Sequence, residues 1–533
     1  MSLWQRFKNR FGSAQPAPKQ ASQIETHVDG LTAAAFNDFR KSLTGGGGRG
    51  TFRGAHYRGA AETWDPSEYS PNSAWMQDAG GLRRRAWNLY NNNPFAQSAI
   101  ETLILNAVGS GILPERDDPA WDRGFRRWSG LDAHATCEAD IEGDCTLPEL
   151  EAIWLREVML SGGCLTNYHY LPRRSQRVPV SVELIAEERF ADNLQYYGRN
   201  SKTRHRIVLG RELDPRGRTV AFHVLPAGDD LTVNHNGDPI RIPAENARYT
   251  FRKRRTGEKR GTTMLRTAII WFHALGYYFD RELFNSNLRN RWAYVIERDP
   301  EWCPTGSENE LEEVQLIDAA TQEPTDVMQP SMVYQTTNGG SIKMVGPNVP
   351  QADSVPWLKL MERAIALSVL LSFEAVFRDT SDVSMGNLRY IQNNDKRVYG
   401  TIQDFTIHHF VGPTTLRFES QAVIAGLPGY LSPFEYAQQR DDLLEQQEYD
   451  CPGFESFNPL EDAKADQINL NTQTDTNRDI AKRKGRNWRQ QFKQAGVERK
   501  EREGLGLTLA GGDKSSGPQN NTTGASTSQG ANE

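Results

Sequence analysis

The chain has 533 residues, a formal net charge of −6 and a pI near 6.0. A net acidic balance excludes a protein held on nucleic acid by bulk positive charge, and no stretch reaches the roughly 18 apolar residues expected of a membrane helix. The length predicts two to four domains, and five cysteines without a CxxC pair are typical of a reducing cytoplasm.

The two ends of the chain have compositions that disfavour a packed core. Residues 1–53 hold eight Lys or Arg side chains against three acidic ones, and a run of glycines follows at Gly45–Gly48. We therefore predict a disordered basic arm over residues 1–60, in which Trp4 and Phe11 suit either a docking arm or a small interfacial helix. Residues 510–533 are rich in Ser, Asn, Gly and Thr and are predicted to be disordered.

The first ordered block is predicted to be helical and the second to be rich in strands. A helix over Leu82–Tyr90 precedes a second one from Pro94 to Val108, and the Thr146-to-Glu149 capping box predicts a third that ends near Ser161. Short strands and turns follow over residues 165–251. Val178–Ile185 and Val220–Leu225 are the clearest strands.

A long helix is predicted over Thr262–Trp292, directly after the basic loop Arg252–Gly261. Thr262 or Thr263 is placed to cap the helix, and apolar residues recur at three- and four-residue spacing along it. About 30 residues would form a rod of about 45 Å. Few compact enzymes need such a rod, whereas ring assemblies with a central wall do. The alternative, which this segment alone favours, is a core helix of a large domain preceded by a solvated charge run.

The rest of the chain is predicted to be mainly helical. A helix over Ser354–Phe377 is followed by the polar loop Arg378–Gly386 and a further helix over Asn387–Phe410. Charged helices over Pro433–Glu448 and Asp462–Gly504 complete the ordered part and are expected at a periphery.

Motifs that would indicate catalysis are missing. Gly506–Gly511 has the spacing of a phosphate loop, but Gly512 stands where lysine is required and no strand precedes it. His134, Cys137 and Cys145 do not match the spacing of a common zinc site. We therefore predict that the chain is not an enzyme and has no metal, cofactor or catalytic residues.

Several segments, in order, resemble the lambda-type portal proteins of tailed bacteriophages. The segments that carry the resemblance are Arg84–Ala96, Asn106–Ile112, Asp140–Gly143, Gly210–Asp214, Gly217–His223, Arg260–Gly261, Asp379–Asp382 and Asn458–Ala465. Together they extend over roughly residues 80–507. The chain departs from the family's usual run after the Asp379 loop, where it reads Val383–Arg389.

The resemblance implies a mixed α+β subunit with a helical wing, a helical stem, a small β-rich clip and a C-terminal helical crown. Twelve such subunits commonly form a ring at one capsid vertex. The implied divisions are a first wing part (61–164), a β-rich region with the clip (165–251), the stem loop and helix (252–295), a second wing part with a kinked helix and channel loop (296–425) and the crown (426–509).

The resemblance further implies a DNA channel and several protein partners. Portal proteins nucleate head assembly, dock the terminase, pass DNA inward and later outward, and hold tail-connector proteins. The expected partners are further copies of the chain, the capsid and scaffold proteins, the terminase large subunit, connector proteins and double-stranded DNA read without sequence specificity. The expected location is the virion, with the host cytoplasm during assembly.

Three sets of residues are candidates for these roles. Weak phosphate contacts in the channel, or alternatively salt bridges between subunits, are predicted for Arg378, Arg389, Lys396 and Arg397. Docking to a partner or a neighbouring subunit, with DNA contact as the alternative, is predicted for Arg252, Lys253, Arg254, Arg255, Lys259 and Arg260. Ring contacts are predicted for Phe272, Phe279 and Trp292.

Two other classes of function stay open from the residues alone. One is a monomeric DNA-binding head–tail adaptor that uses the loop at Arg252–Arg260. The other is a metal-dependent DNA-processing enzyme whose acidic residues are scattered along the chain.

Overall fold

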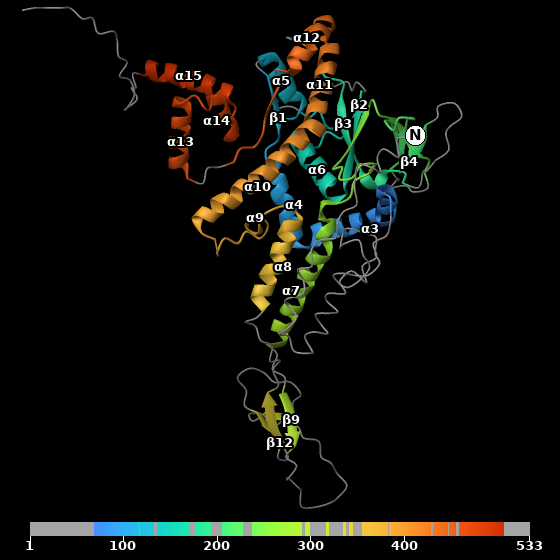
Figure 1. Ribbon diagram of the computed structural model, residues 1–533, viewed down its shortest axis with the longest axis vertical. Helices are drawn as coiled ribbons and strands as arrows, with labels where there is room; N and C mark the ends of the chain where they lie inside the picture. The colour runs from blue at the N-terminus through green and yellow to red at the C-terminus, as the bar shows by residue number, and fades with distance from the viewer. Residues whose placement is uncertain are drawn as a thin grey trace, which may run out of the picture. The chain divides into compact units, whose positions relative to one another are not determined.

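The computed structural model contains two compact units, Met1–Ser70 and Pro71–Glu533. The structure describes residues 69–116, 118–132, 136–170, 176–192, 205–227, 237–289, 294–298, 316–318, 334–336, 340–344, 354–381, 383–427, 430–445, 447–454 and 458–505. All the elements below belong to the second unit (Figure 1). The predicted arm (1–60) and tail (510–533) lie outside the described residues, and Tyr69 and Ser70 are the described residues of the first unit.

Two N-terminal helices lie on either side of a break at Asn93. Helix α3 spans Pro71–Asn92 and α4 spans Pro94–Ala107, with Pro94 at the first turn as predicted. Asn93 caps α4, because its side-chain oxygen accepts from the backbone N–H groups of Phe95 and Ala96 at 3.0 and 3.1 Å. Its amide nitrogen donates to the Phe272 carbonyl at 3.1 Å, so the break also fixes α4 to the later helix α7.

The next two helices both bury aromatic side chains. Helix α5 spans Pro119–Trp128, and α6 spans Leu147–Leu160 behind the predicted capping box, which is confirmed. The Glu149 carboxylate accepts from the backbone N–H of Thr146 at 2.7 Å. Trp121, Phe125 and Trp128 form the buried face of α5.

The predicted β-rich region is confirmed as two antiparallel sheets. The first has the order β3-β2-β8, and the second has the order β4-β5-β6-β7. The strands are β2 (Gly163–His169), β3 (Ser181–Ala186), β4 (Arg206–Val208), β5 (Arg211–Leu213), β6 (Thr219–Val224), β7 (Ile240–Pro243) and β8 (Ala247–Phe251). Their own small core is centred on Phe190, Phe222 and Tyr249, with the 3₁₀ turn η3 (Glu187–Arg189) beside it.

The predicted rod is shorter than expected. Thr263 does cap a helical turn, since its side chain accepts from Leu265 N, but that turn is the 3₁₀ segment η4 (Met264–Thr267). The α-helix proper, α7, spans Ile269–Arg289, which gives a length of about 30 Å. Two strand pairs follow, β9 (Tyr294–Arg298) with β12 (Gly340–Met344) and β10 (Leu316–Asp318) with β11 (Tyr334–Thr336).

The second long helix is broken where a continuous one was predicted. Helix α8 spans Ser354–Ser368 and the short α9 spans Phe373–Phe377. Leu370 between them has a left-handed φ of 62°, which ends the helix. Asp395, on the following helix, holds the break: its two carboxylate oxygens accept from the backbone N–H and the hydroxyl of Ser372 at 3.0 and 2.6 Å.

The remaining elements are mainly helical. Helix α10 (Met385–Thr406) runs through the π-helix η5 (Ile407–Val411) into α11 (Gly412–Ile424). The C-terminal helices are α12 (Pro433–Glu445), α13 (Pro459–Asn471), α14 (Asn477–Arg483) and α15 (Trp488–Gly504). The helical segment predicted over Asp462–Gly504 is therefore divided into three helices, α13 to α15. Strand β13 (Glu448–Asp450) pairs with β1 (Leu113–Glu115), a pairing that the sequence did not indicate.

The main core joins both halves of the described chain. It gathers buried residues of α3–α6 with those of α7, α8, α10 and α11. By contrast, α13 and α15 have no buried residue. Among the described helices, none has both the length and the apolar character to cross a membrane.

Candidate functional surfaces

The basic loop before α7 ends in a buried cation. Arg260 is fully buried, its Nε lies 2.7 Å from Glu187 Oε1 and its Nη1 lies 2.8 Å from Asp192 Oδ1. Its guanidinium also lies over the rings of Phe190 and Trp75, at 3.9 and 4.6 Å from their centroids. Arg260 therefore stabilises the interior of the subunit. Its prediction as a surface docking residue is wrong, because a charge run was read as uniformly exposed.

Burial away from water and the mutual attraction of the two charges together determine the pKa values of Glu187 and Arg260. Burial raises the pKa of the Glu187 carboxyl to about 7, against the opposing effect of the Arg260 guanidinium. Although burial acts to lower it, the pKa of Arg260 is raised because the Glu187 carboxylate stabilises the cation. The Tyr249 hydroxyl donates to Glu187 at 3.0 Å and accepts from Gly261 N at 3.2 Å, which ties the start of η4 to the first sheet.

The other members of the loop differ in exposure. Lys253, Arg254 and Arg255 are exposed, whereas Arg252 and Lys259 are half-buried. Burial lowers the pKa of Arg252, and Lys259 donates to the Gly217 carbonyl at 3.3 Å. Three exposed cations thus remain of the six that were predicted for docking.

Of the three predicted ring-contact residues, one is buried, one is half-buried and one is not described. Phe272 is fully buried in the main core, so the prediction that it contacts a neighbour is wrong. Phe279 is half-buried, with its ring centroid 5.4 Å from that of Phe95. Trp292 lies outside the described residues.

Helix α7 leaves a second apolar stripe uncovered. Ile270, Tyr277 and Phe284 recur at seven-residue spacing and therefore share one face, and each is exposed. The exposed fraction reaches 77% for Ile270. The sequence did carry a signal for this stripe: the apolar and aromatic residues of the helix are distributed around it and are too many for a single buried face.

Helix α8 packs beside α7 and has an uncovered stripe of its own. Trp357, Leu360 and Leu367 are exposed, the last at 73%, while the opposite face of α8 is buried in the core. The Trp357 ring lies 6.1 Å from that of Tyr278, which joins the two helices. We call the exposed residues of the two stripes together the α7–α8 apolar surface. Contiguous exposed apolar patches are typical of interaction sites, so this surface is a candidate for one.

Two of the predicted channel cations lie on one face of α10, seven residues apart. Arg389 is engaged by helix α13, since its Nη2 lies 3.1 Å from Asp462 Oδ1 and its Nη1 lies 3.8 Å from Glu461 Oε2. Lys396 lies 5.7 Å from the centroid of the Phe454 ring. Both contacts are within the subunit, so these cations join α10 to the C-terminal region.

The other two channel candidates are exposed. Arg378 ends α9 in the left-handed conformation with a φ of 57°, and Arg397 lies on the outer face of α10. Arg389 is also exposed, so what separates the pairs is contact: Arg389 and Lys396 contact other parts of the subunit, whereas Arg378 and Arg397 are simply exposed. Their contacts with DNA in a channel, or with another subunit, stay predictions.

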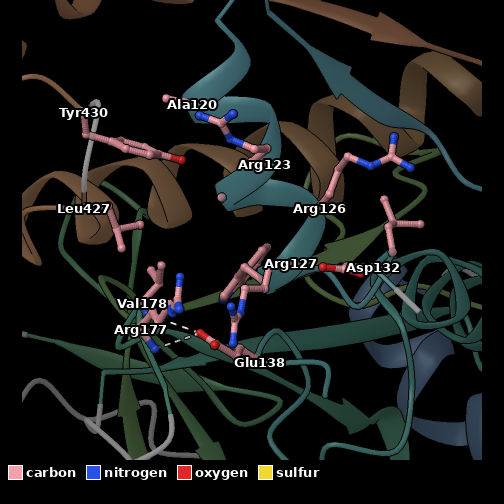
Figure 2. Close-up of a pocket in the computed structure, with 13 residues that line it drawn as sticks. Ala120, Arg123, Arg126, Arg127, Asp132, Glu138, Arg177, Val178, Leu427 and Tyr430 are labelled. Carbon is pink, nitrogen blue, oxygen red and sulfur yellow. Dashed lines mark hydrogen bonds between the residues drawn. The ribbon is translucent and has the colours of Figure 1, made fainter. Parts of the chain in front are cut away.

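A cleft that the sequence did not indicate lies between α5 and the start of the first sheet. It has a volume of about 580 Å³ and is lined by four arginines, Arg123, Arg126, Arg127 and Arg177. Figure 2 shows Arg127 extending from α5 toward Glu138 and Arg177, with Tyr430 and Leu427 across the cleft. A Cβ on Gly124 would lie 2.6 Å from the Tyr430 hydroxyl oxygen, so a larger residue at this position would displace the Tyr430 side chain.

The structure describes two of the three side chains that were considered as zinc ligands, Cys137 and Cys145. Within the described residues, no group of three or more His, Cys, Asp or Glu side chains is arranged to hold an ion. Burial raises the pKa of both Cys137 and Cys145, which disfavours the thiolate that zinc requires. His134 lies outside the described residues.

Comparisons with known proteins agree on one family. A family model described as phage portal protein, lambda family, matches residues 57–403. A probable portal protein of Halomonas phage phiHAP-1 is 21% identical over 441 residues, covering 77% of this chain and 78% of that protein.

Solved structures that match are described as the neck of a native GTA particle computed with C12 symmetry and the virion of a native gene transfer agent particle. Both are 12% identical to this chain. The match to the neck structure has a TM-score of 0.37 and covers 74% of this chain and 89% of the matched chain. The virion has a TM-score of 0.35, with 69% and 89% covered.

Proposed function

Because the chain belongs to the lambda family of phage portal proteins, we propose that its subunits close into a dodecameric ring at one vertex of the capsid. Terminase would pack genomic DNA through the central hole, and the DNA would later leave by the same route. The ring would nucleate head assembly together with the capsid and scaffold proteins and would then hold the connector proteins of the tail. In this role the chain is a structural component of the virion, assembled in the host cytoplasm.

The observation that carries the proposal is the α7–α8 apolar surface. A monomeric protein rarely exposes large apolar side chains along two adjacent helices, because each costs free energy in water. A ring contact is heterologous, so one subunit must present two different faces. The α7–α8 apolar surface supplies one such face, and its residues replace Phe272 in the ring contact that we propose.

The exposed cations have places in the same proposal. Arg378 and Arg397 would touch DNA phosphates weakly and without base recognition, so that DNA is not held in the channel. Lys253, Arg254 and Arg255 would dock on acidic surfaces of a partner or of a neighbouring subunit. Arg389 and Lys396 would keep the C-terminal helices on α10.

Native mass spectrometry of the full-length protein, with electron-microscope class averages, tests the ring. Wild-type protein should give closed rings with a central hole. Ile270→Asp and Leu367→Asp should each shift most of the protein to monomers, because a carboxylate would then be buried at the contact. Circular dichroism of both variants should stay native, since each side chain is exposed in the subunit.

The matched control is Ile424→Asp, which places the same change at an exposed isoleucine of α11 outside the α7–α8 apolar surface. It should leave the rings intact. Rings that survive Ile270→Asp and Leu367→Asp would remove this surface from the contact. A wild-type protein that is monomeric at every concentration would favour the DNA-binding adaptor, and metal-dependent cleavage of DNA by pure protein would favour the enzyme.

A further inference from the structure

We propose that the arginine cleft between α5 and residues 177–178 binds an acidic peptide segment of a partner protein, through Arg123, Arg127 and Arg177. The cleft involves no residue of the α7–α8 apolar surface. It is therefore a binding site in addition to the ring contact, and its test does not depend on ring formation.

The walls of the cleft are held in place by buried groups. On the inner side of α5, Trp128 Nε1 donates to the Val180 carbonyl at 2.9 Å, and the Trp121 and Phe125 rings stack at 5.1 Å. The Tyr430 hydroxyl donates to the Trp121 carbonyl at 3.2 Å. These contacts fix the helix while its arginines face outward, so a ligand meets a site that is already formed.

The opposite wall is fixed by a buried carboxylate. Glu138 Oε2 accepts from the backbone N–H groups of Arg177 and Val178 at 3.0 and 3.3 Å, which Figure 2 shows as dashed lines. This carboxylate is thus occupied by main-chain donors and orients the segment that carries Arg177. Within the described residues, no salt bridge involves Arg123, Arg127 or Arg177.

The charges point to carboxylate ligands carried by a peptide. A guanidinium presents parallel N–H donors that match the two oxygens of a carboxylate, which makes arginine suited to such pairs. Yet Asp132 and Glu138 also line the cleft, and they would repel the continuous row of phosphates on a nucleic acid. A peptide, unlike a nucleic acid, can carry carboxylates only where they meet the arginines and neutral residues where they meet Asp132 and Glu138.

The apolar part of the lining supports the same class of ligand. Leu131, Val178 and Leu427 lie among the charged groups, and Tyr430 presents its ring across from α5 (Figure 2). Such a surface takes an aliphatic side chain between two acidic ones. The volume, about 580 Å³, falls in the range of roughly 300–1,000 Å³ that is usual for binding sites.

The test measures binding of a model peptide to the full-length protein. A fluorescein-labelled peptide of alternating glutamate and leucine is titrated and followed by fluorescence anisotropy, beside a peptide in which glutamine replaces each glutamate. We expect saturable binding of the acidic peptide alone. Arg127→Ala and Arg177→Ala should each weaken it about tenfold, the usual effect of losing one charge-assisted pair.

The control variant is Arg85→Ala, which removes an exposed arginine of α3 that does not line the cleft. It should bind the peptide as the wild type does. Arg127→Glu should lose the acidic peptide and gain a peptide of alternating lysine and leucine, an exchange that a misfolded variant would not show.

Three results would overturn the proposal. One is the absence of saturable binding to the acidic peptide. Another is an equal loss of affinity in Arg85→Ala, which would mean attraction by overall charge. The third is a short DNA duplex that displaces the peptide and is weakened by the same cleft variants, which would assign the cleft to phosphates.

Discussion

In the middle of α6, the side chain of Glu151 is fully buried. Its Oε2 accepts from the backbone N–H of Ile112 at 2.8 Å, while Oε1 has no hydrogen-bond partner among the described residues. Burial raises the pKa of this carboxyl to about 8, against the weaker effect of the Ile112 hydrogen bond. At neutral pH the folded protein therefore keeps a proton that the unfolded chain releases.

This proton makes folding stability fall as pH rises. The folded-state pKa lies above the unfolded value of 4.5, so the stabilisation is complete below about pH 4.5 and is lost progressively up to about pH 8. The slope from this group approaches about 1.4 kcal/mol per pH unit. Glu151→Gln should reduce that slope in denaturant-unfolding curves measured between pH 5.5 and 8.

The comparison requires the same assembly state for both proteins. Burial also raises the pKa of Glu157 and Glu187, so the variant should keep part of the pH dependence. An unchanged slope in Glu151→Gln would show that this carboxyl is ionised in the folded protein or reaches water.

The sequence was least informative about the burial and the partners of individual residues. Arg260 stands in a run of six cations, and nothing local separates it from Arg254 or Arg255. Its buried partner Glu187 lies 73 residues earlier, and only the packing of η3 against the loop brings the two together. The arginines of the cleft were missed for the same reason, because Arg177 meets α5 through tertiary contacts.

At the scale of elements, the turn into α7 depends on two glycines that cross at close range. A Cβ on Gly261 would lie 1.9 Å from the Gly162 carbonyl oxygen and 2.8 Å from Phe251 Cβ. Since the obstacle is backbone, it cannot move aside as a flexible side chain would. Gly162, at the end of α6, itself has a φ of 99°, a conformation that favours glycine.

Gly261→Ala should therefore separate η4 from the end of α6 and destabilise the subunit by about 3 kcal/mol or more. Denaturant unfolding followed by circular dichroism measures the change. The matched variant Gly80→Ala, within α3 with nothing near its added Cβ, should be neutral or stabilising by up to about 1 kcal/mol. Equal stabilities for Gly261→Ala and wild type would mean that Gly261 and the Gly162 carbonyl lie farther apart in the protein than in this structure.

Elements with local signals were predicted well. The Asn93–Pro94 boundary and the Thr146 capping box are read from adjacent residues, and both are confirmed. The break after α8 was missed because Asp395, from another helix, stabilises it. The apolar periodicity of Ser354–Phe377 predicted a helix but could not show that Trp357, Leu360 and Leu367 lie on its uncovered face.

At the scale of the whole molecule, the chain combines a net charge of −6 with a few exposed cations on α9 and α10. Affinity for DNA comes mainly from phosphate contacts and falls with salt in proportion to their number. A ring that passes DNA needs few such contacts per subunit. Its binding to a duplex should therefore be weak and should show a shallow dependence on salt.

Two arginines of α10 should differ in their contribution to DNA binding by the proposed ring. Arg397→Ala should lower affinity for all duplex sequences alike and reduce the salt slope by about one per lost phosphate contact, measured by fluorescence anisotropy across a NaCl series. Arg389→Ala should change the slope little, because Asp462 and Glu461 already engage that side chain. If the reverse order were found, Arg389 would leave its partners on α13 to face the DNA, and the exposed surface at Arg397 would belong to another contact.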